Sequence, residues 1–185
     1  MTPHPAVEQM IDALNAEGLP YMLVGSLSSM FYGIPRSTVD ADFVIQVGDK
    51  PLRAVVSRLS PDFRLNPQMQ FETATGTVKN VLTIQNTDFI VELFRLSSDA
   101  HDLSRFQRRL KVNYFGREVW LPTAEDVILT KARWMRNKDH DDIRDVISVQ
   151  GKRLDWNYID HWAAQHGTIE TLHKIRESAP HLDDE

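Results

Sequence analysis

Hydrophobic positions recur along the chain at two spacings, one helical and one alternating. Hydrophobic residues recur at helical spacing over residues 5–17, and Gly18 follows as a C-cap. A shorter helical stripe starts after Asp49 and Pro51 and stops at Pro61. Short apolar runs and period-two alternation predict strands at residues 21–24, 39–47, 69–73, 78–85 and 88–96. Helices therefore precede and interrupt the strands of the first hundred residues.

The pattern becomes mostly helical toward the C-terminus. We expect a polar surface helix over residues 99–110 and two short strands over residues 112–115 and 118–121. Further helices are expected after Thr123, from about Asp139, and on either side of Gly167. The order predicts an α/β (α+β) protein whose mixed sheet, flanked by helices, occupies residues 5–121. A helical part over residues 122–180 completes a single unit of 185 residues.

Composition narrows the functional classes. The apolar content of 42% is enough for a sizeable core, and the absence of cysteine removes disulfides, thiolate nucleophiles and cysteine–zinc sites. No long apolar run or leader-like amino terminus is present, so we expect a cytoplasmic protein without a membrane segment. Residues 105–153 carry twelve Lys and Arg against seven Asp and Glu, which suits either a polyanion-facing surface or an ordinary solvated one.

The candidate chemistry starts on the strand over residues 39–47. Alternation places Asp40 and Asp42 on the same face of this otherwise apolar strand. Two carboxylates are costly to bury unpaired, and a divalent cation with oxygen ligands would offset that cost. Gly25 and Ser26 lie just ahead of a short predicted helix, whose first N–H groups suit a phosphate. The alternative interpretation is a surface strand with solvated aspartates.

These residues carry a resemblance to a known family. Gly25-Ser26, a spacer and Asp40-Ala41-Asp42 on a strand resemble the nucleotidyltransferases of the polymerase-beta superfamily. Residues 36–42, RSTVDAD, are most similar to the group with the AbiE-type and MenT-type toxins. The resemblance implies a polymerase-beta-like core, a Mg²⁺ site with Mn²⁺ as the alternative ion, and a nucleoside triphosphate such as ATP. It also implies nucleotide contacts from Gly25, Ser26, Arg36 and Thr38.

A third acid is expected on a neighbouring strand. Glu92 is the lone acid within an apolar strand, where alternation puts it on one face with Asp88, Ile90 and Phe94. A third carboxylate there would complete a two-metal site and orient or deprotonate an attacking hydroxyl. The resembling family places its third acid similarly but more often uses Asp, so Asp88 remains the alternative.

Lys131 stands in the middle of the apolar stripe of the helix that follows Thr123. Lysine is rarely buried unpaired, so it either snorkels to solvent or reaches a nucleotide site to neutralise triphosphate charge. The resembling family also has a lysine on a helix after the sheet. If Lys131 reaches phosphates, we expect Lys131→Met to leave stability unchanged or raised. Arg133 and Arg136 are expected at the surface.

A final acidic motif follows on the next helix. Periodicity puts Asp142 beside the apolar stripe and Asp145 further toward solvent, whereas the resemblance favours Asp145 as the acid that serves the site. Both remain candidates for nucleotide binding.

Two hypotheses of different class follow. In the first, a Mg²⁺-dependent nucleotidyltransferase uses Asp40, Asp42, Glu92 and Lys131 to transfer a nucleoside monophosphate to an acceptor hydroxyl with release of pyrophosphate. The resemblance implies an RNA acceptor such as tRNA, a protein or a small molecule, and a cognate antitoxin if the enzyme is toxin-like. In the second, the same fold is a catalytically inactive scaffold that binds a nucleotide or a protein partner.

Overall fold

The computed structural model describes residues 5–48, 52–73 and 76–180. The α/β part contains α1 (Pro5–Glu17), β1 (Tyr21–Val24), α2 (Gly25–Tyr32), β2 (Asp40–Ile45), α3 (Leu52–Val56), β3 (Phe63–Leu65), β4 (Gln70–Glu72), β5 (Thr77–Ile84), β6 (Ile90–Arg95), α4 (Ala100–Arg108), β7 (Leu110–Tyr114) and β8 (Arg117–Leu121). The C-terminal part contains α5 (Ala124–Trp134), α6 (Asn137–Gln150), the short 3₁₀ turn η1 (Gly151–Arg153), α7 (Trp156–His166) and α8 (Ile169–Ser178). No helix in these described ranges is long and apolar enough to cross a membrane.

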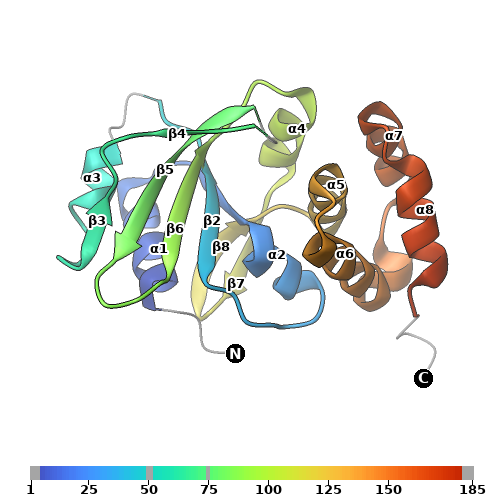
Figure 1. Cartoon of the computed structure of the whole chain (residues 1–185), viewed down its shortest axis with the longest axis horizontal. Coiled ribbons are helices and arrows are strands. Elements are labelled where there is room, and N and C mark those ends of the chain that lie inside the picture. The colour runs from blue at the N-terminus through green and yellow to red at the C-terminus, as the bar shows by residue number, and fades with distance from the viewer. Residues whose placement is uncertain (1–4, 49–51, 74–75, 181–185) are drawn as a thin grey trace.

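The main sheet is mixed, with strand order β1-β2-β6-β5-β3 and with β4 paired to β5 at one end (Figure 1). The pairing of β2 with β6 is parallel, and the neighbouring β1–β2 and β5–β6 pairs are antiparallel. In the parallel pair Asp42 lies opposite Glu92 and Val44 lies opposite Phe94. Because side chains alternate across a strand, these four residues lie on the same face of the sheet. The register thus brings the candidate third acid beside the first two.

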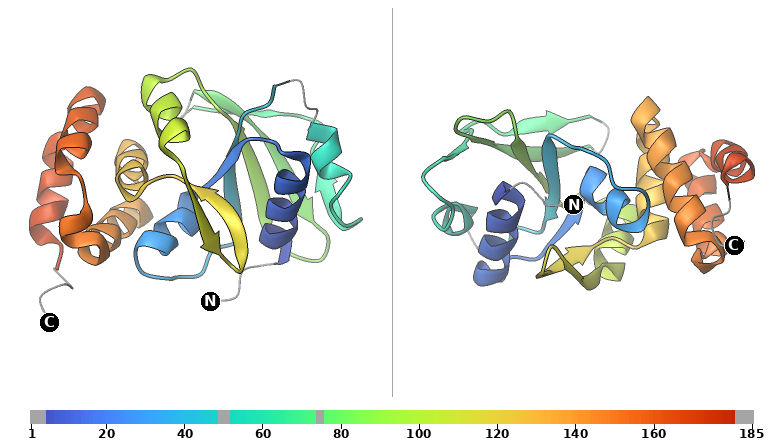
Figure 2. Two further views of the ribbon diagram at one scale, coloured as in Figure 1. Left: turned by 180° about the vertical axis from the view of Figure 1, so that it is seen from behind. Right: turned by 90° about the horizontal axis from the view of Figure 1, so that it is seen from below.

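The two faces of the sheet are covered differently. One face packs on α1, α3 and the β7–β8 hairpin, and its core includes Ile11, Leu14, Phe43 and Leu93, all fully buried (Figure 2). The opposite face carries a much smaller apolar cluster of Met22, Val44, Phe94 and Phe106. Asp40, Asp42 and Glu92 share that second face, so the polar candidates sit where the sheet has the least apolar cover.

The C-terminal helices form their own hydrophobic cluster beside the sheet (Figure 1). Val127 and Ile128 of α5 pack with Ile143 and Val146 of α6 and with residues of α7 and α8. Tyr32 at the end of α2 belongs to this cluster, and its hydroxyl donates to the Pro122 carbonyl at 2.7 Å. The α5–α6 pair therefore lies against α2, the helix that starts at Gly25.

Most predicted elements are confirmed, including the helix over Pro5–Glu17 and the mixed α/β class. Two predictions were wrong in detail. The three-residue strand β3 was missed, because it is too short to show alternation. The helix expected over residues 99–110 is α4, and it is not a surface helix: His101, Asp102, Arg105 and Phe106 are buried. Its polar interior residues are paired with one another and with α5, as with the ion pair between Arg105 and Asp102 at 2.9 Å, which sequence periodicity does not reveal. The predicted helix start at Asp49 lies outside the described residues.

The packing of α7 on α4 gives a pH-dependent prediction. Burial, followed by the nearby His101 and Arg133, lowers the pKa of His166 from 6.5 to about 4. The folded state thus favours the neutral ring. The contribution of His166 to the stability of the protein is therefore fully present above pH 6.5 and is lost as the pH falls from 6.5 toward 4. We expect His166→Gln to reduce this acid loss, which is at most about 3 kcal/mol and less where solvent reaches the ring. Urea unfolding at pH 7 and pH 5 measures it.

The matched control is His161→Gln, which changes an exposed histidine of the same helix. This variant should follow the wild-type pH dependence. An identical pH slope for wild type and His166→Gln would contradict the assignment.

Candidate active site

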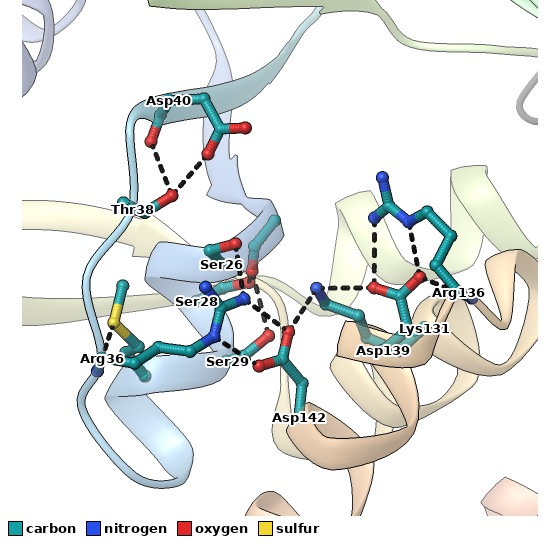
Figure 3. Close-up of polar contacts among 12 residues, drawn as sticks. Ser26, Ser28, Ser29, Arg36, Thr38, Asp40, Lys131, Arg136, Asp139 and Asp142 are labelled. Atoms are coloured by element: carbon teal, nitrogen blue, oxygen red, sulfur yellow. Dashed lines mark hydrogen bonds and ion pairs between the residues drawn. The ribbon is translucent and has the colours of Figure 1, made fainter. Parts of the chain in front are cut away.

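Three carboxylates converge on the open face of the sheet. Asp40 and Asp42 come from β2 and Glu92 from β6, and Thr38 Oγ1 donates to Asp40 Oδ1 at 2.5 Å (Figure 3). All three acids are partly exposed. Burial raises the pKa of Asp42 to about 7, and the charges of Asp40 and Glu92 and a hydrogen bond with Glu92 raise it further. Asp42 is therefore a carboxyl group that lacks a sufficient counter-charge.

A divalent cation fits this deficit. Hard oxygen ligands from one or two carboxylates, completed by substrate phosphates, are what Mg²⁺ ordinarily takes, and a cation at Asp42 would favour its charged form. Glu92 is currently neutralised by Lys79, whose Nζ lies 2.8 Å from its carboxylate. Lys79 also contacts Glu72 at 3.6 Å. The third acid is thus present but held in an ion pair.

Gly25 forms the junction of β1 and α2 against Asp42. Its φ is +64°, and a Cβ built on it would lie 2.0 Å from Asp42 Oδ2. No side chain fits there without displacing the carboxylate, so glycine is required by both the backbone conformation and the close approach. The Ser28 and Ser29 hydroxyls donate to the Gly25 carbonyl at 2.9 and 3.1 Å. These two hydrogen bonds fix the first turn of α2, whose first residue lies against Asp42.

Arg36 connects this turn to the C-terminal helices. Its Nε and Nη2 donate to the two carboxylate oxygens of Asp142 at 2.9 and 3.0 Å, and Nη2 also donates to Ser26 Oγ at 2.9 Å. Arg36 and Asp142 are predicted site residues, and here they form a bidentate pair between the segment that follows α2 and helix α6 (Figure 3). The pairing with Arg36 and Lys131 outweighs burial and lowers the pKa of Asp142.

Lys131 is buried and paired, and it does not snorkel to solvent. Its side chain is only 6% exposed, and Nζ donates to Asp142 at 2.6 Å and to Asp139 at 3.0 Å. The expectation that Lys131→Met leaves stability unchanged or raised assumed an ammonium without carboxylate partners. The structure changes that premise, since the substitution would strip a counter-charge from two buried carboxylates. Lys131 still borders the cavity that contains the three acids.

Asp139 and Arg136 complete the network, and sequence reasoning missed both. Asp139 is fully buried, accepts from the Arg136 backbone N–H and side chain, and contacts Lys131. Arg136 is exposed, as expected, and it also borders the acidic cavity, where hydrogen bonds with its partner Asp139 raise its pKa. The available signal was the position of Asp139, three residues after Arg136 at the start of α6, where an acid caps a helix.

The remaining candidates lie outside this network. The carboxylate of Asp145, three residues after Asp142 on α6, pairs with Arg144 at 3.8 Å. Asp88, the alternative third acid, is exposed before β6, two residues from the hairpin turn. Of the alternatives left open by the sequence, Asp142 and Glu92 are the ones that the fold brings to the site.

The acids and cations together line a cavity of about 120 Å³, which we call the polar cavity. Its lining consists of Gly25, Ser26, Asp40, Asp42, Glu72, Lys79, Glu92, Phe94, Lys131, Trp134, Arg136 and Lys138. Carboxylates lie at the sheet and cations lie on β5, α5 and α6. This arrangement can hold a metal cation and a polyphosphate side by side.

One other set of potential metal ligands occurs in the described residues. Ligand atoms of Asp99, His101 and Asp102 lie within 4.8 Å of one another. The Asp99 carboxylate caps α4 by accepting from the backbone N–H groups of His101 and Asp102, and it pairs with Arg133. His101 contacts Asp126, and Asp102 pairs with Arg105. Helix capping and these ion pairs account for the cluster without an ion.

Comparisons with known proteins identify the family and the fold. The model of a family described as "Nucleotidyltransferase of unknown function (DUF6036)" matches residues 6–179. No curated protein matches the chain.

Several solved structures share the fold. The antibiotic-resistance factor ANT(2")-Ia in complex with adenylyl-2"-tobramycin aligns with a TM-score of 0.62 at 12% identity, over 88% of this chain and 95% of that one. The lincosamide adenylyltransferase LnuA bound to lincomycin aligns with a TM-score of 0.55 at 13% identity, over 80% and 98%. A nucleotidyltransferase of Thermotoga maritima aligns with a TM-score of 0.53 at 14% identity, over 76% and 89%.

Proposed function

The chain belongs to the DUF6036 family of nucleotidyltransferases, and on that premise we propose that it transfers a nucleoside monophosphate from a nucleoside triphosphate to an acceptor hydroxyl with release of pyrophosphate. The observation that carries the proposal is the parallel register that sets Asp42 opposite Glu92, beside the turn at Gly25. A surface strand with solvated aspartates would not need a third acid, a glycine in contact with Asp42 and a facing row of cations.

Each group has a chemical task in this proposal. Asp40, Asp42 and Glu92 would hold Mg²⁺ or Mn²⁺, which would neutralise phosphate charge and lower the pKa of an attacking hydroxyl. The first N–H groups of α2, at Gly25 and Ser26, would bind the terminal phosphates. Lys131, with the arginines of its network, offsets their charge, and Thr38 orients Asp40. Catalysis would then consist mainly of positioning and charge neutralisation.

Arg36 and Asp142 have a positioning role in the proposal. The pair fixes Ser26 on one side and Lys131 on the other, so that helix turn and ammonium face the polar cavity together. Asp139 shares Lys131 and adds Arg136 to the same side of the cavity. We assign no nucleotide contact to Asp145.

The acceptor class is a finer proposal. The resemblance to AbiE-type and MenT-type toxins, together with the basic residues between 105 and 153, favours RNA such as tRNA as the acceptor, with a cognate antitoxin as partner and action in the cytoplasm. The solved structures with adenylyl-tobramycin and lincomycin make a small-molecule hydroxyl the alternative. A protein hydroxyl is the third class.

The proposal is tested by incubating the protein with Mg²⁺ and each nucleoside triphosphate labelled at the α-phosphate, in cell extract. Transfer predicts release of pyrophosphate and label on RNA, on protein or on small molecules, which fractionation separates. A set of reactions in which all four nucleotides leave every fraction unlabelled, with purified RNA added, would refute transfer.

Glu92→Gln separates turnover from binding. Since Glu92 is placed to hold the metal that meets the acceptor, the substitution should lower kcat by roughly 10²-fold or more while nucleotide affinity changes severalfold at most. Steady-state kinetics and titration with a non-reactive nucleotide measure the two effects. Glu118→Gln is the matched control, because it removes the charge of an exposed glutamate that pairs with Lys111 on the β7–β8 hairpin, and it should change neither quantity. Equal losses of affinity and kcat would remove Glu92 from the reaction centre.

The Lys79–Glu92 ion pair also supports a second candidate, a scaffold that binds nucleotide without turnover. In such a protein Lys79 would stay paired with Glu92 when nucleotide binds. Neither the wild type nor Lys79→Met would then transfer nucleotide. If the enzyme proposal is right, Lys79→Met leaves a measurable rate that still depends on Glu92.

A further inference from the structure

A second cavity, which we call the apolar slot, opens beside the polar cavity. Its walls include Val24, Val44, Thr77, Phe94, Val127 and Trp134. The slot and the polar cavity share Gly25, Asp42, Phe94, Lys131, Trp134 and Arg136 among their lining residues, so the two spaces are contiguous. Among the described residues, Asp40 and Glu92 border the polar cavity but not the slot.

This division identifies what can occupy the slot. A chemical group in the slot is adjacent to Gly25 and Lys131, where the proposed function puts the phosphates. The same group is not adjacent to Glu92, where that function puts the acceptor hydroxyl. The part of a nucleotide that continues from its phosphates is the nucleoside. The rings of Phe94 and Trp134, with the Arg136 guanidinium 4.3 Å from the Trp134 ring centroid, provide planar surfaces on which a base can stack.

The hydroxyl groups that line the slot already form hydrogen bonds within the protein. Ser28 donates to the Gly25 carbonyl and Thr77 to the Arg95 carbonyl, each at 2.9 Å. Thr130 Oγ1 donates to the Asp126 carbonyl at 2.8 Å and accepts from Arg105 at 3.1 Å.

The charged groups behind them are committed as well. The Asp126 carboxylate accepts from Thr123 and Tyr158 at 3.0 and 2.8 Å and contacts His101 at 3.1 Å. Asp102 pairs with Arg105 at 2.9 Å. Arg95, which also lines the slot, donates from Nη2 to Asn80 Oδ1 at 3.0 Å. Apart from Asp42, Lys131 and Arg136, which the slot shares with the polar cavity, these polar side chains thus hold the fold, and the slot presents mainly apolar and planar surface to a ligand.

We propose that the apolar slot binds the nucleobase by stacking and apolar contact and does not read the hydrogen-bonding edge of the base. The inference rests on the proposed function, because it requires the phosphates at Gly25 and Lys131. Adenine and guanine have nearly the same shape but opposite donor and acceptor patterns. A site that hydrogen-bonds its ligand rejects a mismatched analogue by about 10⁴-fold or more, whereas an apolar pocket separates similar ligands far less.

The first measurement is equilibrium binding of non-reactive α,β-methylene analogues of ATP, GTP, CTP and UTP, and of inorganic tripolyphosphate, to the full chain with Mg²⁺. We expect the ATP and GTP analogues to bind within about fivefold of each other, and both to bind roughly tenfold or more tighter than tripolyphosphate, because stacking adds to the phosphate contacts. A preference of about 100-fold or more between adenine and guanine would overturn the inference.

The second measurement fills the slot. Thr77→Phe places a ring in the slot from the start of β5, and it should weaken the nucleotide analogues toward the affinity of tripolyphosphate while tripolyphosphate itself binds as before. The matched control is Thr83→Phe, which makes the same change at an exposed position of the same strand, and it should bind every ligand as wild type does. Val44→Phe, from β2, fills the slot independently and should reproduce the effect if Thr77→Phe folds poorly.

The outcomes distinguish this inference from the proposed function. If tripolyphosphate and nucleotides bind equally well, the phosphate site stands and the slot assignment fails. If Thr77→Phe and Val44→Phe both leave nucleotide affinity unchanged, the base lies elsewhere and the slot assignment again fails. If neither tripolyphosphate nor any nucleotide binds in the presence of Mg²⁺, the proposed function fails and the inference fails with it.

Discussion

Asp42→Asn is expected to abolish nucleotide transfer while leaving the metal-free protein as stable as wild type or more stable. Asn keeps the shape that fits against Gly25, but it removes the charge on which Mg²⁺ binding would depend. The rate should fall roughly 10³-fold or more. Burial and the charges of Asp40 and Glu92 raise the pKa of Asp42 to about 7, so its ionised form is held against their repulsion. Removing that charge should raise the free energy of unfolding by roughly 1–3 kcal/mol at pH 8.

Thermal melts with and without Mg²⁺, alongside the labelled-nucleotide assay, measure both halves of this expectation. Asp88→Asn is the control, because it removes an exposed carboxylate that precedes β6. It should change neither the melting temperature nor the rate. A parental transfer rate in Asp42→Asn would end the assignment of this acid.

Lys131→Met is expected to impair stability and nucleotide binding together. Breaking a buried ion pair by removing one partner costs about 3–5 kcal/mol when the remaining charge has no other partner. Asp142 keeps Arg36 and Asp139 keeps Arg136, so we expect about 1–3 kcal/mol here. Nucleotide affinity should also fall by about 1.5–3 kcal/mol, the value of a charge-assisted contact to phosphate.

A charge-balancing second substitution separates the two effects. Asp139→Asn in the Lys131→Met background removes an acid left without its ammonium, so it should recover part of the lost stability while nucleotide affinity stays low. Arg133→Met, on the same helix but exposed and paired with Asp99, is the control for removing a cation. Restored affinity in the double variant would return Lys131 to a purely structural role.

The sequence pattern was sufficient to predict the position of a site residue where that position depends only on the strand or helix that carries it. Alternation placed Asp40 and Asp42 on a single face, and the lone acid in an apolar strand pointed to Glu92. Helical periodicity put Asp142 beside the buried stripe, where the structure has it 5% exposed. The resemblance had favoured Asp145, whose carboxylate faces Arg144.

Pattern was insufficient where a side chain's partner comes from another element. Lys131 was found at a buried position, but its acids lie on the next helix, and Lys79 reaches Glu92 from a neighbouring strand. Arg105 and Asp102 looked solvated because each is polar, and only the packing of α4 on α5 reveals that they satisfy one another in the interior. Such pairings depend on tertiary distances that residue spacing does not encode.

The ion pair between Arg36 and Asp142 also has a consequence for synthesis of the chain. These residues are separated by 106 positions, so the contact closes only after α6 has been made. Until then a nascent chain already carries Gly25, Asp40, Asp42 and, once α5 has been made, Lys131, but it lacks the two acids of α6 that hold this lysine. Because chains are made from the N-terminus and long loops close late, the proposed site is incomplete on the ribosome until α6 has emerged. A ribosome-bound chain halted before α5 should therefore not retain nucleotide, whereas a chain that has exposed α6 should.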